Sequence, residues 1–301
     1  MGFSSVFFGL HFSILAQSGI VIVSNDSKPL PYASVINMRT GRGVFGSVNG
    51  QVDLNSTLFS AGDTIKITYT GYEERFIKLP ILQPTIVLKS QPIELDPVAV
   101  YPCPNAIPII LKNYSKFVSD YSLGTGTNPS GSWAAFIPNI DNVRGILETI
   151  TMELSFWSVP SNARKAPFKL RLLSYDSSSG LPGSPLIAKE WVVHPKGKKL
   201  ILPIIEENLR LPKQGIVVAI DYFFAGEQYL YKRNLRMSKP DGNHKDTVVT
   251  YYGSHIRAAR AQNLLGKGYS YFYKTGKWYP FTSYQSGIGA PMVSLGIKVC
   301  K

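Results

Sequence analysis

The stretch DTIKITYTGYEERFIKL, residues 63–79, decides the fold of the first third of the chain. Ile65, Ile67 and Tyr69 alternate with polar residues, which is the period-2 pattern of a strand with one buried face. Thr70 and Gly71 interrupt this run, and glycine adopts the positive φ that a tight turn requires. A second alternating run follows over residues 72–79, so the stretch predicts a β-hairpin.

Further short strands are predicted on both sides of this hairpin. The strongest turn signal is Asn49-Gly50, which is typical of a two-residue hairpin between residues 44–47 and 52–54. The other predicted strands of the first third are 19–24, 32–38 and 85–88. About seven short strands at this spacing indicate a small β-sandwich over residues 18–90.

Three segments carry a resemblance to a known family. They read GIVIVSNDSKPLPYASV, TGRGVFGSVNGQVDL and GDTIKITYTGYEERFIKL. Their order resembles the carboxypeptidase-regulatory-like (transthyretin-like) domain of exported Bacteroidetes-type proteins, with Val52 where the family more often has Phe. The resemblance implies a transthyretin-like sandwich, and it does not imply peptidase activity.

Composition and charge indicate two folded units. The 301 residues are 44% hydrophobic and 17% charged, which favours packed cores over disorder. The net charge is +13, yet residues 1–101 hold equal numbers of basic and acidic side chains, so the excess lies in residues 102–301. A chain of this length accommodates two domains of ordinary size.

The first 17 residues are apolar and have the length of a signal-peptide core rather than of a membrane span. They lack the basic residues that usually begin such a segment, and a buried first strand is the alternative. We expect export to the periplasm, the outer-membrane surface or the extracellular space, with no transmembrane span.

A proline-rich linker is predicted between the two units, over residues 91–108. Cys103 and Cys300 are the two cysteines of the chain, near the two ends of the second unit. In an oxidising compartment they either form a disulfide or remain unpaired.

Residues 109–301 predict a second sandwich, with one short helix over residues 109–118 and a loop over 123–131. Residues 254–268 are predicted as either a surface helix or an irregular loop. Strands are expected at 148–157, 168–175, 187–193, 199–203, 216–224, 230–237, 270–273, 277–281 and 292–299. The segments KLRLLSYD, GLPGSPLI and LRLPKQGIVVAIDY resemble those of jelly-roll or galactose-binding-like modules. The expected fold class is all-β, with a transthyretin-like sandwich followed by a jelly-roll-like sandwich.

Motifs of catalysis and metal binding are absent from the sequence. The histidines have no metal-ligand spacing, no G-x-S-x-G occurs, and the G-x-G-x-x-G at residues 41–46 precedes strand and turn rather than a helix. The adjacent acids Glu73-Glu74 and Glu206-Glu207 point to opposite faces of extended backbone. We therefore expect no enzyme, no cofactor and no metal.

The candidate site lies in residues 227–284, which hold nine of the 17 tyrosines and many cations. YSYFYKTGKWYPF, residues 269–281, predicts a hairpin with Tyr269, Tyr271 and Tyr273 on one face. Aromatic rings stack on the apolar faces of sugars, and cations bind carboxylate or sulfate groups. The candidate ligand-binding residues are Tyr269, Tyr271, Tyr273, Lys274, Lys277, Trp278, Arg257 and Arg260. The alternative is that these tyrosines are ordinary cross-strand residues and that the lysines protect sheet edges.

The function expected from these patterns is a non-catalytic cell-envelope binding or adhesion module for an anionic glycan. One alternative is an assembly module whose edge strand pairs with another envelope protein. A carbohydrate- or peptide-active hydrolase with acids scattered in the sequence is a further alternative. Nucleic acid is not an expected partner.

Overall fold

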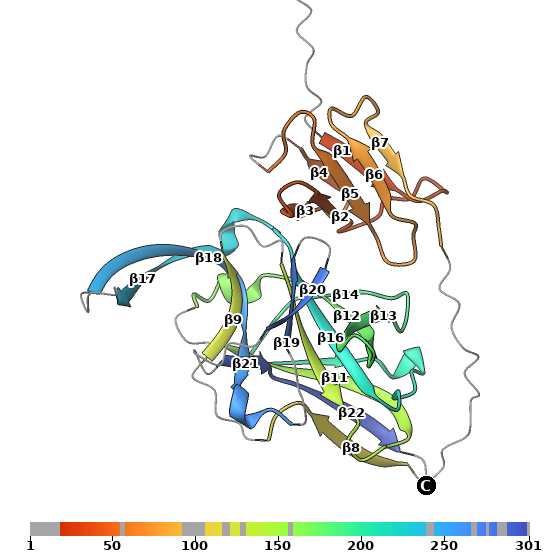
Figure 1. Cartoon of the computed structure of the whole chain (residues 1–301), viewed down its shortest axis with the longest axis vertical. Helices are drawn as coiled ribbons and strands as arrows, with labels where there is room; N and C mark the ends of the chain where they lie inside the picture. Colours follow the sequence, from red (N-terminus) through yellow and green to blue (C-terminus); the bar gives the residue numbers. More distant parts are fainter. Residues whose placement is uncertain are drawn as a thin grey trace, which may run out of the picture.

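A computed structural model describes residues 19–54, 58–91, 106–115, 121–126, 131–155, 159–238, 244–265, 270–274, 277–281 and 288–299. These residues form an all-β molecule of two sandwiches, one above the other in Figure 1. The helical elements among them are four 3-10 turns of three residues each: η1 Ala163–Lys165, η2 Ile205–Glu207, η3 Glu227–Tyr229 and η4 Ala261–Asn263. No helix in the described ranges has the length and apolar character needed to cross a membrane.

The N-terminal sandwich packs a three-stranded sheet, in the order β4-β1-β7, on a four-stranded sheet, in the order β3-β2-β5-β6. Its strands are β1 Gly19–Val23, β2 Ser34–Asn37, β3 Gly43–Phe45, β4 Gln51–Asp53, β5 Thr64–Thr68, β6 Arg75–Lys78 and β7 Thr85–Val87. One core of residues from both sheets fills the space between them, with Ile22, Val35 and Ile65 fully buried.

The hairpin predicted over residues 63–79 is confirmed. β5 pairs antiparallel with β6, from Thr64 opposite Lys78 to Ile67 opposite Arg75. Gly71 lies in the connection with φ +82°, a conformation that a side chain would strain. Ile65 and Ile67 face the core, so Lys66 and Thr68 face outward.

The Asn49-Gly50 prediction was wrong in its pairing. β3 pairs with β2 in one sheet, whereas β4 pairs with β1 in the other sheet. The turn therefore carries the chain from sheet to sheet. Gly50 suits it because its φ is +71° and an added Cβ would lie 2.5 Å from the Ile22 carbonyl oxygen.

The C-terminal sandwich packs a seven-stranded sheet on an eight-stranded sheet. The seven-stranded sheet runs β13-β12-β16-β10-β19-β20 with β14 beside β12, and the eight-stranded sheet runs β17-β18-β11-β22-β8 with β15 beside β11 and β9 and β21 beside β18. The strands of the first are β10 Ser132–Pro138, β12 Phe168–Asp176, β13 Leu181–Pro185, β14 Trp191–Val193, β16 Gly215–Tyr222, β19 Ser270–Lys274 and β20 Lys277–Phe281. Those of the second are β8 Ile107–Lys112, β9 Tyr121–Gly126, β11 Gly145–Ser155, β15 Lys199–Pro203, β17 Leu230–Ser238, β18 His244–Arg260, β21 Ile288–Pro291 and β22 Val293–Val299.

Four predictions for the second unit were wrong, and tertiary pairing explains each one. The expected helix at 109–118 is strand β8 as far as Lys112, because β8 pairs with β22. Part of the expected loop at 123–131 is β9, which pairs with β18. Residues 254–260, expected as a helix or a loop, belong to the long strand β18. Of the strand expected at 187–193, only residues 191–193 form a strand, β14, and the preceding strand β13 ends at Pro185.

The signal peptide expected at 1–17, and 92–105 of the linker, lie outside the described residues.

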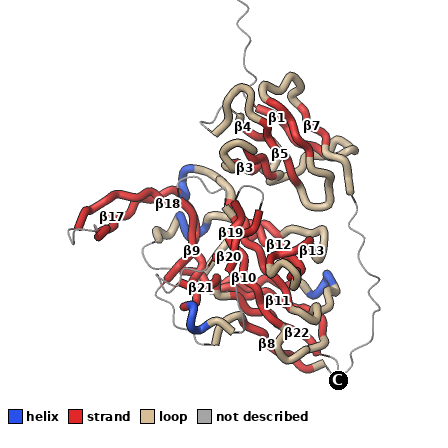
Figure 2. The backbone as a smooth tube through the Cα atoms, in the orientation of Figure 1, coloured by secondary structure: helices blue, strands red, loops and turns tan. Residues whose placement is uncertain are grey.

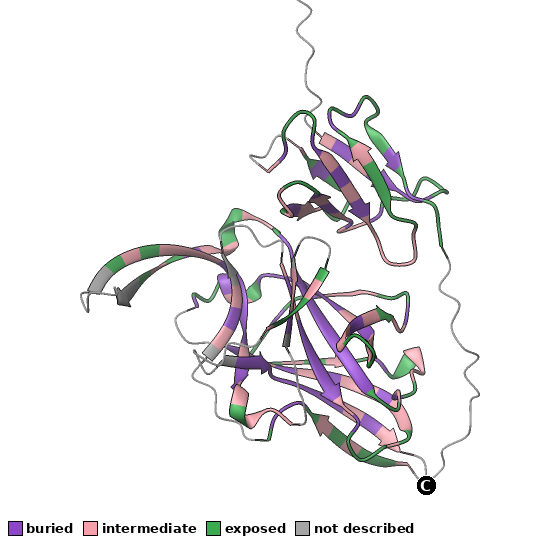
Figure 3. Ribbon diagram, in the orientation of Figure 1, coloured by how far each residue is buried: buried purple, intermediate pink, exposed green. Residues whose placement is uncertain are grey.

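Figures 2 and 3 show two further features of the C-terminal sandwich. β17 and β18 form a curved two-stranded ribbon that extends from the body of the sandwich (Figure 2). β16 is buried at every residue, because the sandwich core covers one face of the seven-stranded sheet and further structure covers the other (Figure 3).

Candidate functional site

The two sandwiches meet where the outer face of β2, β3 and β5 faces the outer face of the seven-stranded sheet. Phe223, which follows β16, is buried here against the rings of Tyr32 and Phe45, at centroid distances of 4.7 and 5.9 Å. The Nζ atom of Lys169 lies 5.2 Å from the Phe45 ring centroid. Apolar burial and one buried cation therefore join the N-terminal sandwich to the C-terminal one.

A row of side chains crosses the seven-stranded sheet at this junction. The strand register places Lys169 opposite Asp221, Asp221 opposite Ser132, Ser132 opposite Tyr273, and Tyr273 opposite Trp278. Directly opposite residues of antiparallel strands share a face. The row thus brings together residues from five strands that are far apart in the sequence.

The ion pair of Arg171 and Asp221 forms the floor of the junction. Arg171 donates from Nε to Oδ2 at 2.6 Å and from its terminal nitrogen to Oδ1 at 2.9 Å, a bidentate geometry. Burial raises the pKa of the Asp221 carboxyl, but the Arg171 charge and hydrogen bonds outweigh burial, and the pKa lies below its ordinary value. Asp221 is therefore an ionised acceptor and not a proton donor near neutral pH.

A second ion pair, within the C-terminal sandwich, is hydrogen-bonded to the N-terminal sandwich through both of its partners. Lys169 Nζ lies 2.7 Å from Glu190 Oε2 and donates to the Tyr32 carbonyl oxygen at 2.9 Å. Thr70, in the turn after β5, donates to the other oxygen of Glu190. The Lys169 and Glu190 side chains are 5% and 11% exposed, so their attraction is little screened by water.

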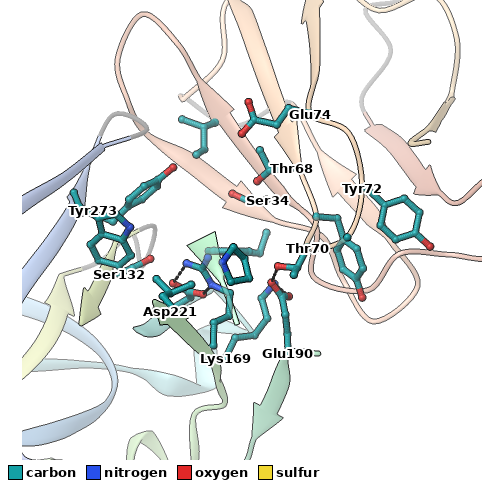
Figure 4. A pocket seen from close by; sticks show the side chains of 18 of the residues that line it. Ser34, Thr68, Thr70, Tyr72, Glu74, Ser132, Lys169, Glu190, Asp221 and Tyr273 are labelled. Carbon is teal, nitrogen blue, oxygen red and sulfur yellow. Dashed lines mark hydrogen bonds and ion pairs between the residues drawn. The ribbon is translucent and has the colours of Figure 1, made fainter. Parts of the chain in front are cut away.

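A cavity of about 620 Å³ opens between the two sandwiches at this place, and we call it the junction cleft. In Figure 4, Ser34 and Thr68 project into it from the N-terminal sandwich, and Tyr273 borders it from the C-terminal sandwich. Its lining also includes Phe45, Thr70, Tyr72, Glu74, Ser132, Lys169, Arg171, Glu190, Asp221 and Trp278. This volume falls in the range of small-molecule sites, roughly 300–1,000 Å³.

The charges of the junction cleft are matched in pairs. Besides Lys169–Glu190 and Arg171–Asp221, Glu74 is bound by Lys66 at 2.6 Å. Burial raises the pKa of Tyr273, so its hydroxyl is a neutral donor and acceptor at physiological pH. The cleft thus offers hydroxyls, paired charges and five aromatic side chains, those of Phe45, Tyr69, Tyr72, Tyr273 and Trp278.

The structure separates the residues that the sequence predicted as one site. Tyr273 and Trp278 line the junction cleft, with their ring centroids 5.0 Å apart and an interplanar angle of 60°. Tyr271 is fully buried in a small core on the same outer face, where its hydroxyl donates to the Gly180 carbonyl oxygen at 2.9 Å. Tyr271 therefore supports the sheet and does not contact the cleft.

The predicted cations lie elsewhere. Lys277 is exposed at the start of β20, and Arg257 and Arg260 belong to β18 of the other sheet. The Lys274 side chain, Tyr269 and both cysteines lie outside the described residues, so the expected disulfide stays a prediction. Among the residues that the structure describes, no group of three or more His, Cys, Asp or Glu is arranged to hold a metal ion.

Sequence reasoning missed Lys169, Arg171, Glu190 and Asp221. A signal for Asp221 was present, since it is an acid in the otherwise apolar strand GIVVAID. An isolated charge in a strand that is buried on both faces requires a partner. Arg171 and Lys169 alternate with core residues of β12, and alternation alone does not show that a second sandwich covers them.

A buried histidine forms a separate polar cluster at the base of the β17–β18 ribbon. His255 lies 3.0 Å through Nε2 from the Tyr231 hydroxyl and 3.3 Å through Nδ1 from the Ser122 hydroxyl. Burial, together with the nearby Arg233, lowers the pKa of His255 to about 4. Gly124 provides the space, because a Cβ there would lie 2.2 Å from the imidazole.

Comparison with known proteins assigns the chain to no family. No family model matches the sequence, and no curated protein matches it. Among solved structures, one similar chain comes from the structure of infectious bursal disease virus Gt strain, with 12% identity and a TM-score of 0.23. The alignment covers 90% of this chain and 55% of the viral chain, so this chain spans about half of the viral chain's length. A likeness at that TM-score carries no information on fold or function.

Proposed function

We propose that this protein binds a saccharide without transforming it, and that the binding site is the junction cleft. The observation that carries the proposal is the pair of rings Tyr273 and Trp278 at a cleft lined with hydroxyls and with ion pairs. Aromatic rings offer their faces to the C–H groups of a sugar, and Ser, Thr and carboxylate oxygens satisfy its hydroxyls.

The matched charges favour a neutral saccharide over the anionic glycan expected from the sequence. An anionic ligand would need a cationic side chain that is not already ion-paired, whereas Lys169 is paired with Glu190 and Arg171 with Asp221. Separating either pair would leave a buried carboxylate uncompensated, which is costly. A neutral ligand can accept and donate hydrogen bonds while both pairs stay intact.

The cellular setting that we propose comes from the sequence. The apolar residues 1–17 and the resemblance to the regulatory-like domain favour export and a place in the cell envelope. N-terminal sequencing of the protein recovered from its native cells tests this, with a mature chain that begins near residue 18 as the expected result.

A glycan array probed with the full chain, followed by calorimetric titration of each hit, tests the binding function. We expect neutral glycans to bind and Tyr273→Ala to weaken binding about fivefold, since one stacked ring contributes on the order of 1 kcal/mol. Tyr273→Phe keeps the ring and should keep most of the affinity. Tyr279→Ala is the matched control, because Tyr279 is the 47% exposed residue next to Trp278 and is not part of the cleft lining.

Two outcomes contradict the proposal: no glycan binds, or binding persists unchanged in a Tyr273→Ala, Trp278→Ala double variant whose melting curve is cooperative. Binding of anionic glycans alone would restore the original expectation and refute the argument from matched charges.

Hydrolysis of a saccharide is the second candidate, because the carboxylates of Glu74, Glu190 and Asp221 all line the cleft. Each of the three already contacts a cation at 2.6 or 2.7 Å, so using it as a general acid would require breaking an ion pair. Release of reducing ends from a bound glycan that stops in Glu190→Gln would establish this alternative.

A further inference from the structure

The β17–β18 ribbon extends beyond the sheet to which it belongs. β17 pairs with β18 over its whole length, from Leu230 opposite Tyr252 to Ser238 opposite His244. Among the residues that the structure describes, β9 pairs with the other side of β18 no further toward the tip than Tyr251. The outer part of the ribbon is therefore two strands wide, as Figure 1 shows, and two isolated strands are marginally stable in water.

The base of the ribbon is firmly anchored. Tyr231 and Tyr251 stack at 5.8 Å, and the hydroxyl of Tyr231 contacts His255 at 3.0 Å. The buried Tyr252 accepts a hydrogen bond from the Ala225 N–H at 2.6 Å. These contacts hold the base of the protruding ribbon against the body of the sandwich.

The outer edge of β17 lacks the proline that protects four other edges of the same sandwich. The edge strands β8, β13, β15 and β20 contain Pro108, Pro182 and Pro185, Pro203, and Pro280 respectively, whereas the shorter edge strands β9 and β14 lack proline, as β17 does. Proline lacks the N–H that a further strand would use, and it is a common way to protect an edge. β17 has no proline in its nine residues, and within the described chain it pairs with β18 alone.

The charge of β17 indicates what could pair with it. Its sequence, LYKRNLRMS, holds three cations and no acid, and Lys232 and Asn234 are exposed. Val248, on the strand beside it, is 61% exposed and adds an apolar contact. A second copy of β17 would bring like charges together across the new strand pair, which is unfavourable. An acidic segment would meet complementary charge instead.

We propose that β17 is a docking edge for an acidic, extended segment of another protein, which adds to the sheet as a further strand. Main-chain hydrogen bonds supply the pairing, and cations such as Lys232 select an acidic sequence. This surface is independent of the junction cleft, so the protein would hold a saccharide and a protein partner at the same time.

The test is a selection of random peptides of about strand length, displayed on phage, against the immobilised full chain. The expected result is enrichment of peptides rich in Asp and Glu with β-forming residues between them. In direct titration at low salt, Lys232→Glu should weaken the selected peptides about tenfold, and added salt should weaken them in the unaltered protein. Lys199→Glu, on the exposed edge strand β15, is the matched control and should leave binding unchanged.

Proline substitutions at two neighbouring residues of β17 distinguish the contribution of main-chain pairing to peptide binding from that of charge. Successive N–H groups of a strand alternate between its two edges, so one of Arg233→Pro and Asn234→Pro removes an outward N–H and preserves the ladder to β18. Whichever of these two variants keeps its thermal stability should no longer bind the selected peptides.

Three outcomes would overturn the proposal. The enriched peptides show no acidic bias, or they bind Lys232→Glu and the stable proline variant undiminished. Random-sequence duplex DNA binds more tightly than the peptides and with the same dependence on Lys232. Light scattering shows a dimer that the substitution Lys232→Glu dissociates, which would mean that a second copy of this chain pairs with β17.

Discussion

Strands β16 and β15 lie in opposite sheets of the C-terminal sandwich and differ in their pattern of burial. β16 is GIVVAIDY and is buried at every position, whereas β15 is KLILP and alternates between exposed and half-buried. The difference is in what covers the outer face: the N-terminal sandwich and the β13 region cover that of β16, and solvent meets that of β15. A polar residue on a covered face needs a partner, and the paired charges of the junction cleft lie on the covered face of β16.

The largest effect should come from breaking the charge network on the covered face. Lys169→Met leaves Glu190 buried without its cation and should lower the free energy of unfolding by about 4 kcal/mol. The control is Lys199→Met on the exposed face of β15, expected to change stability by less than about 0.5 kcal/mol. Urea unfolding measures both. Equal effects would mean that the N-terminal sandwich does not cover this face in solution.

The next effect tests a titrating group in the eight-stranded sheet. The pKa of His255 is about 4 in the folded protein, compared with about 6.5 for an unperturbed histidine. Because the unfolded chain binds the proton more readily, stability should fall as pH drops from 6.5 to 4, by about 3 kcal/mol in total. His255→Gln should flatten this slope in thermal unfolding over that pH window. An unchanged slope would place the titration on another group.

Truncation of neighbouring residues should sharpen the contrast between the strands. Val217 and Val218 point to opposite faces of β16 and are both fully buried, so each change to Ala should cost about 2 kcal/mol. In β15, Leu202→Ala should cost more than about 1 kcal/mol and Ile201→Ala less than about 0.5 kcal/mol. Chemical denaturation of the four variants checks the pattern. Similar costs for Ile201 and Leu202 would contradict it.

The smallest effect concerns the small core beside the junction cleft. Tyr271→Phe removes the hydrogen bond to the Gly180 carbonyl and should cost about 1 kcal/mol, with saccharide affinity unchanged. Tyr273→Phe should leave stability nearly unchanged. If Tyr271→Phe weakened saccharide binding instead, Tyr271 would belong to the binding site and its assignment to the core would be wrong.

Period-2 alternation was sufficient to predict strands such as β5, β15 and β20, because each has one face on a core and a local turn signal. It was insufficient for β8, β9 and β18, whose backbone groups are satisfied by distant strands. Within the candidate site, the sequence identified Tyr273 and Trp278 from local aromatic density. It did not identify Lys169, Glu190 or Asp221, since nothing local shows that a second sandwich covers them.

The sequence by itself determined that this chain is all-β, that residues 63–79 form a hairpin, and that aromatic residues gather in β19 and β20. Only the tertiary structure decided that Tyr271 is core, that Tyr273 borders a cleft, and that Arg257 and Arg260 lie in the other sheet. The physical reason is that alternation specifies which side chains share one face of a strand. What lies against that face is decided by strand pairing and sandwich contact between residues far apart in the chain.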